Sequence, residues 1–214
     1  MRVLLAGATG LVGAQVLRQL LDDPRCTGVV APTRRPLTEA AALASGRLRN
    51  PVQDFAALPM DADWWQVDAA ICALGSTLKQ AGSREAFRQI DHGYPLAIAQ
   101  AVRRNGCTVF ALNSAMGARA DSRVFYNRVK GELERDLRAL DFASLTLVRP
   151  GLIGGARSER RTGEHLASVV LGALAPVLPR AWRINPATHI ASALVEAALA
   201  PPPGVHVVGS AQLA

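Results

Sequence analysis

The 214-residue sequence has little cysteine, little lysine and few aromatic residues. Its three cysteines, Cys26, Cys72 and Cys107, form no C-x-x-C pair, so neither a disulfide framework nor a cysteine-based metal site is expected. The four histidines are equally dispersed, and we predict no metal site. Few aromatic residues stand among the basic ones and no nucleic-acid module is recognisable, which argues against nucleic-acid binding.

Long hydrophobic runs are also absent. One of the longest, residues 166–179, falls short of the roughly 18 residues of a membrane-spanning helix and contains Pro176. We therefore expect no membrane span. A signal peptide is an alternative interpretation of the apolar N-terminus, but the glycine spacing there has a better explanation, given below. The sequence thus predicts a cytosolic protein.

Lysine is rare although the net charge is +7. Arginine supplies 22 of the 24 basic residues, and the two lysines are Lys79 and Lys130. At positions where either basic residue would provide the positive charge, this chain has arginine rather than lysine. The position of each lysine is therefore informative.

Short apolar runs alternate with longer amphipathic ones. The apolar runs predict buried parallel strands at residues 2–7, 27–33, 67–75, 107–114 and 144–150, with weaker candidates at 47–52 and 205–208. Helices are predicted at residues 11–21, 84–104, 123–140 and 187–199, with one more between residue 151 and the last of these. This alternation predicts an α/β fold with a doubly wound parallel sheet in a single domain.

The motif GATGLVG spans residues 7–13, between the first predicted strand and the first predicted helix. Gly7 would permit a tight turn, Gly10 would let a pyrophosphate approach the backbone, and Gly13 would let the helix pack on the sheet. The amides and dipole of the helix N-terminus attract phosphates. No Gly-Lys-Ser/Thr follows, which excludes a Walker motif. We predict a dinucleotide site; a purely structural turn is the alternative.

Two arginines follow the second predicted strand. A pocket for NAD normally offers a carboxylate to the adenosine ribose, whereas Arg34 and Arg35 suit a 2′-phosphate. NADP(H) is therefore favoured over NAD(H). A solvated arginine pair is the alternative interpretation.

The segment FYNRVKGELE, residues 125–134, carries the second group of candidate residues. Tyr126 and Lys130 are four residues apart in a predicted helix, so their side chains share one face. A nearby ammonium favours the phenolate, which makes tyrosine an effective acid or base toward a carbonyl or alcohol. Ser114, at the end of a predicted strand, would hold the substrate oxygen. An incidental surface pair is the alternative.

Together, GATGLVG, ALGST (residues 73–77), NSA (113–115), YNRVK (126–130) and RPG (149–151) resemble the short-chain dehydrogenase/reductase superfamily. The G-x-x-G-x-x-G spacing resembles its atypical branch. LGSTLKQAGSREAFRQIDHGYP with YNRVKGELE is most similar to the Tat-interacting-protein-like NAD(P)-binding oxidoreductases.

This resemblance implies an NAD(P)-binding Rossmann fold, with residues 1–150 as cofactor core and 151–214 as a smaller substrate-side and C-terminal segment. It implies a catalytic triad of Ser114, Tyr126 and Lys130. Many carbonyl-reducing relatives carry an asparagine that sustains a proton relay where this chain has Asp91 and His92. The cofactor contacts that it implies are Gly7, Thr9, Gly10, Leu11, Val12, Gly13, Arg34, Arg35, Asp54, Phe55, Leu74, Gly75, Ser76, Tyr126, Lys130, Pro150 and Leu152.

Two classes of function are expected. The first is an NADP(H)-dependent oxidoreductase acting on a small-molecule carbonyl or alcohol; an epimerase or dehydratase would use the same site. The second is a non-catalytic NADP(H) sensor that contacts a protein partner. A monomer and a homodimer are both compatible with the sequence.

Overall fold

A computed structural model describes residues 1–154 and 183–214 of the chain. Its main sheet has seven parallel strands in the order β3-β2-β1-β4-β5-β6-β9. The order runs outward from β1 in both directions, which places a topological switch point between β1 and β4. The predicted doubly wound sheet is confirmed. Its strands are β1 (Arg2–Ala6), β2 (Gly28–Val30), β3 (Leu48–Arg49), β4 (Ala69–Cys72), β5 (Val109–Asn113), β6 (Ser144–Arg149) and β9 (Gly204–Gly209).

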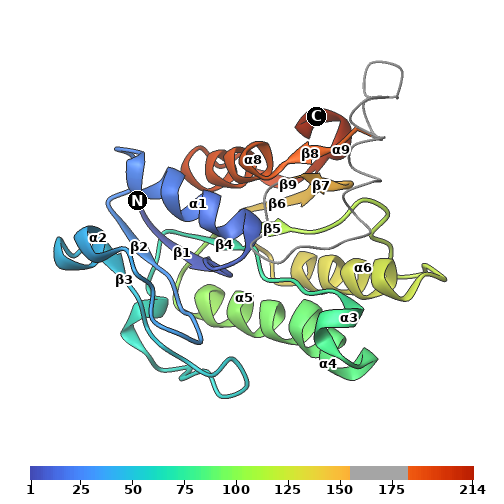
Figure 1. The fold of residues 1–214 in the computed structure, drawn as a ribbon, viewed down its shortest axis with the longest axis horizontal. Helices are drawn as coiled ribbons and strands as arrows, with labels where there is room; N and C mark the ends of the chain where they lie inside the picture. Colours follow the sequence, from blue (N-terminus) through green and yellow to red (C-terminus); the bar gives the residue numbers. More distant parts are fainter. Residues whose placement is uncertain (155–182) are drawn as a thin grey trace.

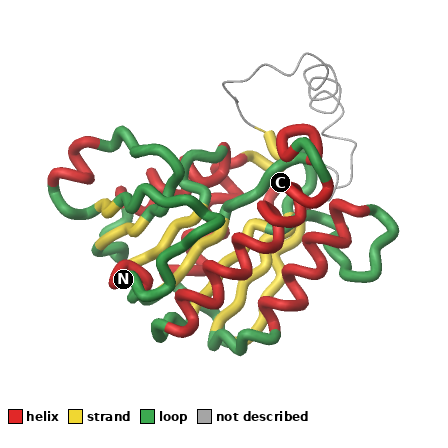
Figure 2. Tube along the Cα trace, turned by 90° about the horizontal axis from the view of Figure 1, so that it is seen from below, coloured by secondary structure: helices red, strands yellow, loops and turns green. Residues whose placement is uncertain are grey.

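Helices cover both faces of the sheet. Helices α1 (Leu11–Asp22) and α8 (Ala187–Leu199) lie on one face, and α5 (Tyr94–Arg104) and α6 (Phe125–Arg138) lie on the other (Figure 1). In Figure 2 the neighbouring strands run side by side, as their pairing requires. Strand β1 shows why the strands are apolar throughout: Val3 and Leu5 join one core, Leu4 and Ala6 the other. A strand buried on both faces has no polar side.

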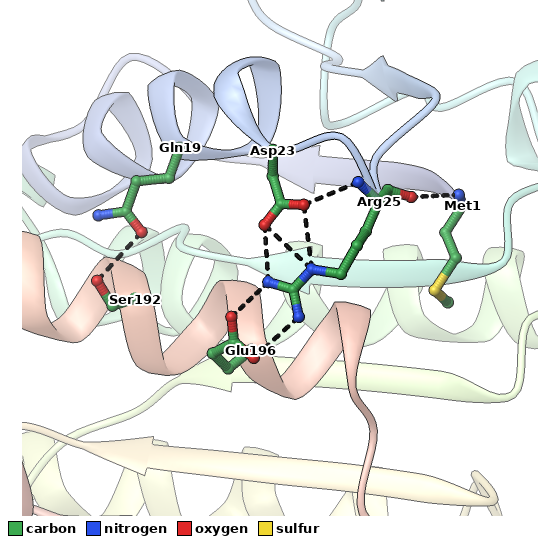
Figure 3. Close-up of polar contacts among 6 residues, drawn as sticks. All are labelled: Met1, Gln19, Asp23, Arg25, Ser192 and Glu196. Atoms are coloured by element: carbon green, nitrogen blue, oxygen red, sulfur yellow. Dashed lines mark hydrogen bonds and ion pairs between the residues drawn. The ribbon is translucent and has the colours of Figure 1, made fainter.

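Helices α1 and α8 pack side by side although they lie far apart in the sequence. Arg25, just after α1, pairs with Asp23 and with Glu196 of α8, and Ser192 of α8 donates a hydrogen bond to Gln19 of α1 at 3.2 Å (Figure 3). These polar contacts are exposed, and exposed ion pairs contribute little to stability. The buried apolar side chains beneath them hold the two helices together. They include Val16, Leu17, Leu20, Ile190 and Leu194.

The helix predicted over residues 84–104 is interrupted. It consists of α4 (Arg84–Arg88), a π-helical turn η2 (Gln89–Gly93) and α5. The hydroxyl of Ser83 caps α4 by accepting a hydrogen bond from the backbone N–H of Ala86 at 3.1 Å. A π turn inserts an extra residue into the helix and rotates the side chains around it, and such turns often occur at functional sites.

Several short elements were not predicted, because two to five residues are too few for a periodic pattern. They are α2 (Ala40–Ala44), η1 (Asp63–Trp65), α3 (Leu78–Ala81), β7 (Ile153–Gly154), β8 (Asn185–Pro186) and α9 (Ser210–Leu213). The apolar stretch 166–179 and the extra helix expected before α8 lie outside the described residues. Across residues 1–154 and 183–214, no helix combines the length and apolar character needed to cross a bilayer.

Candidate active site

A cavity of about 140 Å³ lies where β5 and β6 end. The backbone N–H of Met116 donates to the carbonyl of Pro150 at 2.8 Å. This hydrogen bond holds together the segments that follow β5 and β6. The carboxyl ends of parallel strands are where α/β folds bind ligands. The cavity is lined by Ser114, Ala115, Met116, Tyr126, Pro150, Gly151 and Ile153.

Tyr126 projects into this cavity from the first turn of α6. Its ring is half-buried and packs against Phe87 of α4, with 5.6 Å between the ring centroids. Lys130 follows one helical turn later on the same face, and its side chain is only 3% exposed. The structure therefore places the predicted tyrosine at the cavity and the predicted lysine one helical turn behind it, in the interior.

The ammonium of Lys130 is held by a buried carboxylate. Its Nζ lies 2.8 Å from Oδ1 of Asp91, which is fully buried in the π turn. Burial alone would lower the pKa of Lys130, but attraction to Asp91 and to Tyr126 outweighs it, so the pKa is raised. The other oxygen of Asp91 accepts a hydrogen bond from the backbone N–H of Ser76 at 2.8 Å. Asp91 thus joins α6 to the loop after β4.

Ser114 lines the cavity, but its hydroxyl hydrogen is engaged. Its Oγ donates to Oε1 of Glu134 at 2.6 Å, and Glu134 is 1% exposed. Glu134 also accepts two hydrogen bonds from Arg149, whose pKa is raised by that contact. A carboxylate only accepts, so Ser114 must donate to it, and the serine hydroxyl can then act only as an acceptor toward a ligand. Sequence reasoning missed Glu134, although it follows Tyr126 and Lys130 at four-residue spacing.

The glycine-rich turn joins β1 to α1. Gly7 has φ of +90°, and a Cβ there would lie 2.7 Å from the carbonyl carbon of Ala73. A Cβ on Gly13 would lie 1.9 Å from the oxygen of Gly7. A Cβ on Gly10 would meet nothing closer than that same oxygen, at 3.4 Å. The fold itself requires Gly7 and Gly13, whereas Gly10 leaves open space. Of the other residues predicted to contact the pyrophosphate, Thr9 lies in the turn, and Leu11 and Val12 begin α1.

Arg34 and Arg35 lie in an exposed loop beyond β2. Within the described part of the chain, neither guanidinium has a hydrogen-bond or ion-pair partner. The loop is nevertheless fixed: Thr33 Oγ1 donates to the carbonyl of Arg35 at 2.6 Å, and Asn50 donates to that Thr33 oxygen at 2.8 Å. Asn50 also accepts from the backbone N–H of Leu37 at 2.8 Å. Two cations without a partner among the described residues are thus held on a hydrogen-bonded loop.

The remaining predicted cofactor contacts differ in exposure. Phe55 is buried and packs on Tyr94, with 5.9 Å between the ring centroids, so its ring belongs to the core. Asp54 is exposed and accepts a hydrogen bond from the backbone N–H of Ala56 at 2.9 Å. Leu152, 48% exposed, follows β6 close to the cavity. Leu74, Gly75 and Ser76 form the loop after β4, and Pro150 is buried in the cavity wall.

Asn185 supports the cavity wall and was not predicted. Its Oδ1 accepts from the backbone N–H of Gly151 at 2.7 Å and from the hydroxyl of Ser210 at 2.9 Å. Its side chain is fully buried. The turn after β6 is therefore tied to β8 and α9. Asn185 lies in a segment without periodicity, so no sequence signal pointed to it.

No family model matches the chain. It is 35% identical over 209 residues to the protein named fmp52, mitochondrial, of Aspergillus fumigatus, covering 92% of this chain and 86% of the relative. It is 34% identical over 181 residues to Protein HTATIP2 of Rattus norvegicus, covering 84% and 72%. The chain belongs to the family of Fmp52 and HTATIP2. The predicted membership of the atypical short-chain dehydrogenase/reductase superfamily is confirmed.

Solved structures share the fold of this Fmp52/HTATIP2 family member. MoeE5 in complex with UDP-glucose and NAD superposes with a TM-score of 0.72 at 18% identity, covering 98% of this chain and 76% of MoeE5. A putative NAD-dependent epimerase/dehydratase from Bacillus halodurans gives 0.66 at 19% identity, covering 99% and 97%. These likenesses establish a Rossmann-like fold in a single domain.

The predicted cytosolic location is wrong by this comparison. Relatives from Emericella nidulans, Aspergillus fumigatus and Eremothecium gossypii are all named as mitochondrial proteins. The prediction rested on the lack of a membrane span and of a secretory signal. Neither feature separates the cytosol from the mitochondrion, which is why the inference failed.

Proposed function

We propose that this protein is an NADP(H)-dependent oxidoreductase acting on a small carbonyl or alcohol, with Tyr126 transferring the proton. One observation carries the proposal: Tyr126 faces a cavity at the carboxyl ends of β5 and β6, with the Lys130 ammonium one turn behind it. A phenol beside a fixed cation is suited to exchange a proton with a substrate oxygen. When bound, the nicotinamide would supply or accept the hydride.

The residues present fit such a cofactor. The open space at Gly10 leaves room for a pyrophosphate above the first amides of α1, which have no partners within the helix. Arg34 and Arg35 would bind the 2′-phosphate. Gly75 and Ser76, beside the Lys130–Asp91 pair, would border the ribose next to the nicotinamide.

Tyr126 would carry the proton alone. Among the described residues that line the cavity, Ser114 and Tyr126 are the two whose side chains carry a hydroxyl. Because Ser114 gives its hydrogen to Glu134, the Tyr126 hydroxyl is the one that remains to donate to a carbonyl oxygen. In the reverse direction, the phenolate of Tyr126 would accept the single hydroxyl hydrogen of a substrate alcohol and remove it as the proton.

The cavity lining favours an apolar substrate. Ala115, Met116, Pro150 and Ile153 supply most of its side chains, and they offer no hydrogen bonds to a sugar. We therefore propose a carbonyl flanked by apolar groups, in preference to the UDP-sugars named for some fold neighbours. An epimerase or a cofactor-dependent sensor would share the same cofactor site.

The proposal is tested by incubating the protein with NADPH and a series of aldehydes, ketones and quinones, and following the loss of NADPH absorbance. Turnover that improves with apolar substituents supports the proposal. NADPH binding by calorimetry without turnover of any compound would favour the sensor. Conversion of UDP-glucose without net cofactor consumption would favour the epimerase.

Removing the loop arginines is expected to weaken NADPH binding selectively. A charge-assisted contact to phosphate contributes about 1.5–3 kcal/mol, so Arg34→Ala and Arg35→Ala should each raise the Kd for NADPH by about 10-fold or more. The Kd for NADH, which lacks the 2′-phosphate, should change little. Isothermal titration calorimetry with both cofactors measures the difference.

Arg104→Ala is the matched control, because Arg104 is an exposed arginine at the end of α5. It lies shortly before the start of β5, at the opposite end of the strands from their carboxyl ends. It should leave both dissociation constants unchanged. Equal weakening of NADPH and NADH in the Arg34 and Arg35 variants would contradict the assignment.

A further inference from the structure

Resting on the proposed function, we propose that Asp91 is a positioning residue that holds the Lys130 ammonium and offsets its charge. As a consequence, Tyr126 lies one helical turn from a paired ammonium, whose field is weaker than that of a lone one. The carboxylate acts through Lys130 and contacts no reacting atom. Its position in the π turn, between α4 and α5, gives this interruption of the helix a function.

The geometry makes Asp91 the centre of a three-way contact. One carboxylate oxygen lies 2.8 Å from Lys130 Nζ, and the other accepts the backbone N–H of Ser76 at 2.8 Å. A Cβ placed on Gly75 would lie 3.4 Å from Asp91 Oδ1 and 3.6 Å from Lys130 Nζ. The loop proposed to border the nicotinamide ribose therefore rests directly on the ion pair. Both charged side chains are almost completely removed from water.

The groups around the pair come from α6, β4 and the π turn. Tyr126 faces Lys130 from α6, and Cys72 faces it from β4. Burial raises the pKa of the Cys72 thiol to about 11, so it is neutral at neutral pH. His92, next to Asp91, pairs instead with Asp136 of α6, with 2.8 Å between Nε2 and Oδ2. Among residues 1–154 and 183–214, Asp91 is therefore the anion that balances Lys130.

The consequence follows from elementary electrostatics. A lone ammonium next to a phenol strongly stabilises the phenolate, by about 1–3 pH units when opposite charges lie within a few ångströms. An ammonium paired with a carboxylate acts as a dipole, whose field is weaker and falls off faster. Many carbonyl-reducing relatives carry a neutral asparagine in this part of the helix, as noted above. The carboxylate here should therefore weaken the field of the Lys130 ammonium at Tyr126.

Spectroscopic titration of the cofactor-free protein tests this inference. The chain has two tyrosines, Tyr94 and Tyr126, so the phenolate absorbance that disappears in Tyr126→Phe belongs to Tyr126. We expect Asp91→Asn to move the midpoint of that titration to lower pH by about one unit or more. Asp136→Asn removes a carboxylate that contacts His92 instead of Lys130, and it should leave the midpoint unchanged.

Two further variants test the same inference if Asp91→Asn folds poorly. Lys130→Met leaves Asp91 facing Tyr126 and should raise the midpoint, whereas the double variant Asp91→Asn/Lys130→Met removes both charges and should titrate near wild type. Circular dichroism establishes that each variant is folded. An unchanged midpoint in folded Asp91→Asn, or a double variant that titrates like Lys130→Met, would overturn the inference.

Kinetics separate this inference from the proposed function. In an active enzyme, the alkaline dependence of kcat for alcohol oxidation should move to lower pH in Asp91→Asn, in parallel with the phenolate titration. If the titration moves but no carbonyl or alcohol is turned over, the oxidoreductase proposal fails while the role of Asp91 stands. A moving kcat profile with a stationary titration refutes the role of Asp91 alone.

Discussion

Tyr126→Phe is expected to lower kcat for carbonyl reduction by about 10²-fold or more, which is the usual contribution of a positioned general acid. The substitution removes one oxygen atom and keeps the ring, which packs against Phe87 at 5.6 Å. Because the hydroxyl hydrogen of Ser114 is engaged by Glu134, that serine should not replace the lost donor. Steady-state kinetics with saturating NADPH measures the effect.

Tyr94→Phe provides the matched control, since Tyr94 is the chain's other tyrosine and its ring packs on Phe55 in the core. It should leave kcat within about twofold of wild type. The Kd for NADPH should be nearly unchanged in both variants. A Tyr126→Phe enzyme that keeps most of its turnover would require a different proton donor.

Gly13→Ala is expected to cost about 3 kcal/mol of unfolding free energy or more, a large part of the typical stability of a domain of this size. The added methyl group would lie 1.9 Å from the carbonyl oxygen of Gly7, which is backbone and has no rotamer to change. Helix α1 would have to move away from the sheet and break its packing against α8. The midpoint of urea denaturation measures the loss.

Gly10→Ala separates the fold from the cofactor. A methyl group there has 3.4 Å to its nearest neighbour, so stability should change by no more than about 1 kcal/mol, the scale of an altered N-cap. The same methyl group would occupy the space assigned to the pyrophosphate and should raise the Kd for NADPH by about 10-fold or more, a displacement of about 1.4 kcal/mol. Unchanged NADPH binding in Gly10→Ala would contradict the proposed position of the cofactor.

The architecture could be predicted because each central strand is an uninterrupted apolar run in the sequence. A strand such as β1, buried on both faces, must be apolar at every position, and its neighbours obey the same constraint. Strand β3 is only two residues long in the structure, which explains why its apolar pattern was weak. The ends of the predicted strands extended into loops, because apolar residues continue beyond the last paired residue.

The site could be predicted only where its residues are neighbours along one helix. Tyr126 and Lys130 share a face by four-residue spacing, which a sequence displays directly. For Asp91, the sequence showed only that this chain differs from many relatives at that position. Its contact with Lys130 depends on a π turn, which helix propensities do not predict. The partner of Ser114, Glu134, reaches it across the packing of α6 on the sheet. Contacts of this kind arise from tertiary structure.

The packing of α8 against α1 has a consequence for how the protein is made. The first β-α unit leaves the ribosome long before the helix that covers it, so the apolar side of α1 stays exposed during most of translation. Contacts between such distant segments form slowly, and exposed apolar surface invites aggregation. A nascent chain halted before residue 187 should therefore depend on chaperones, and release of the final segment should complete its folding.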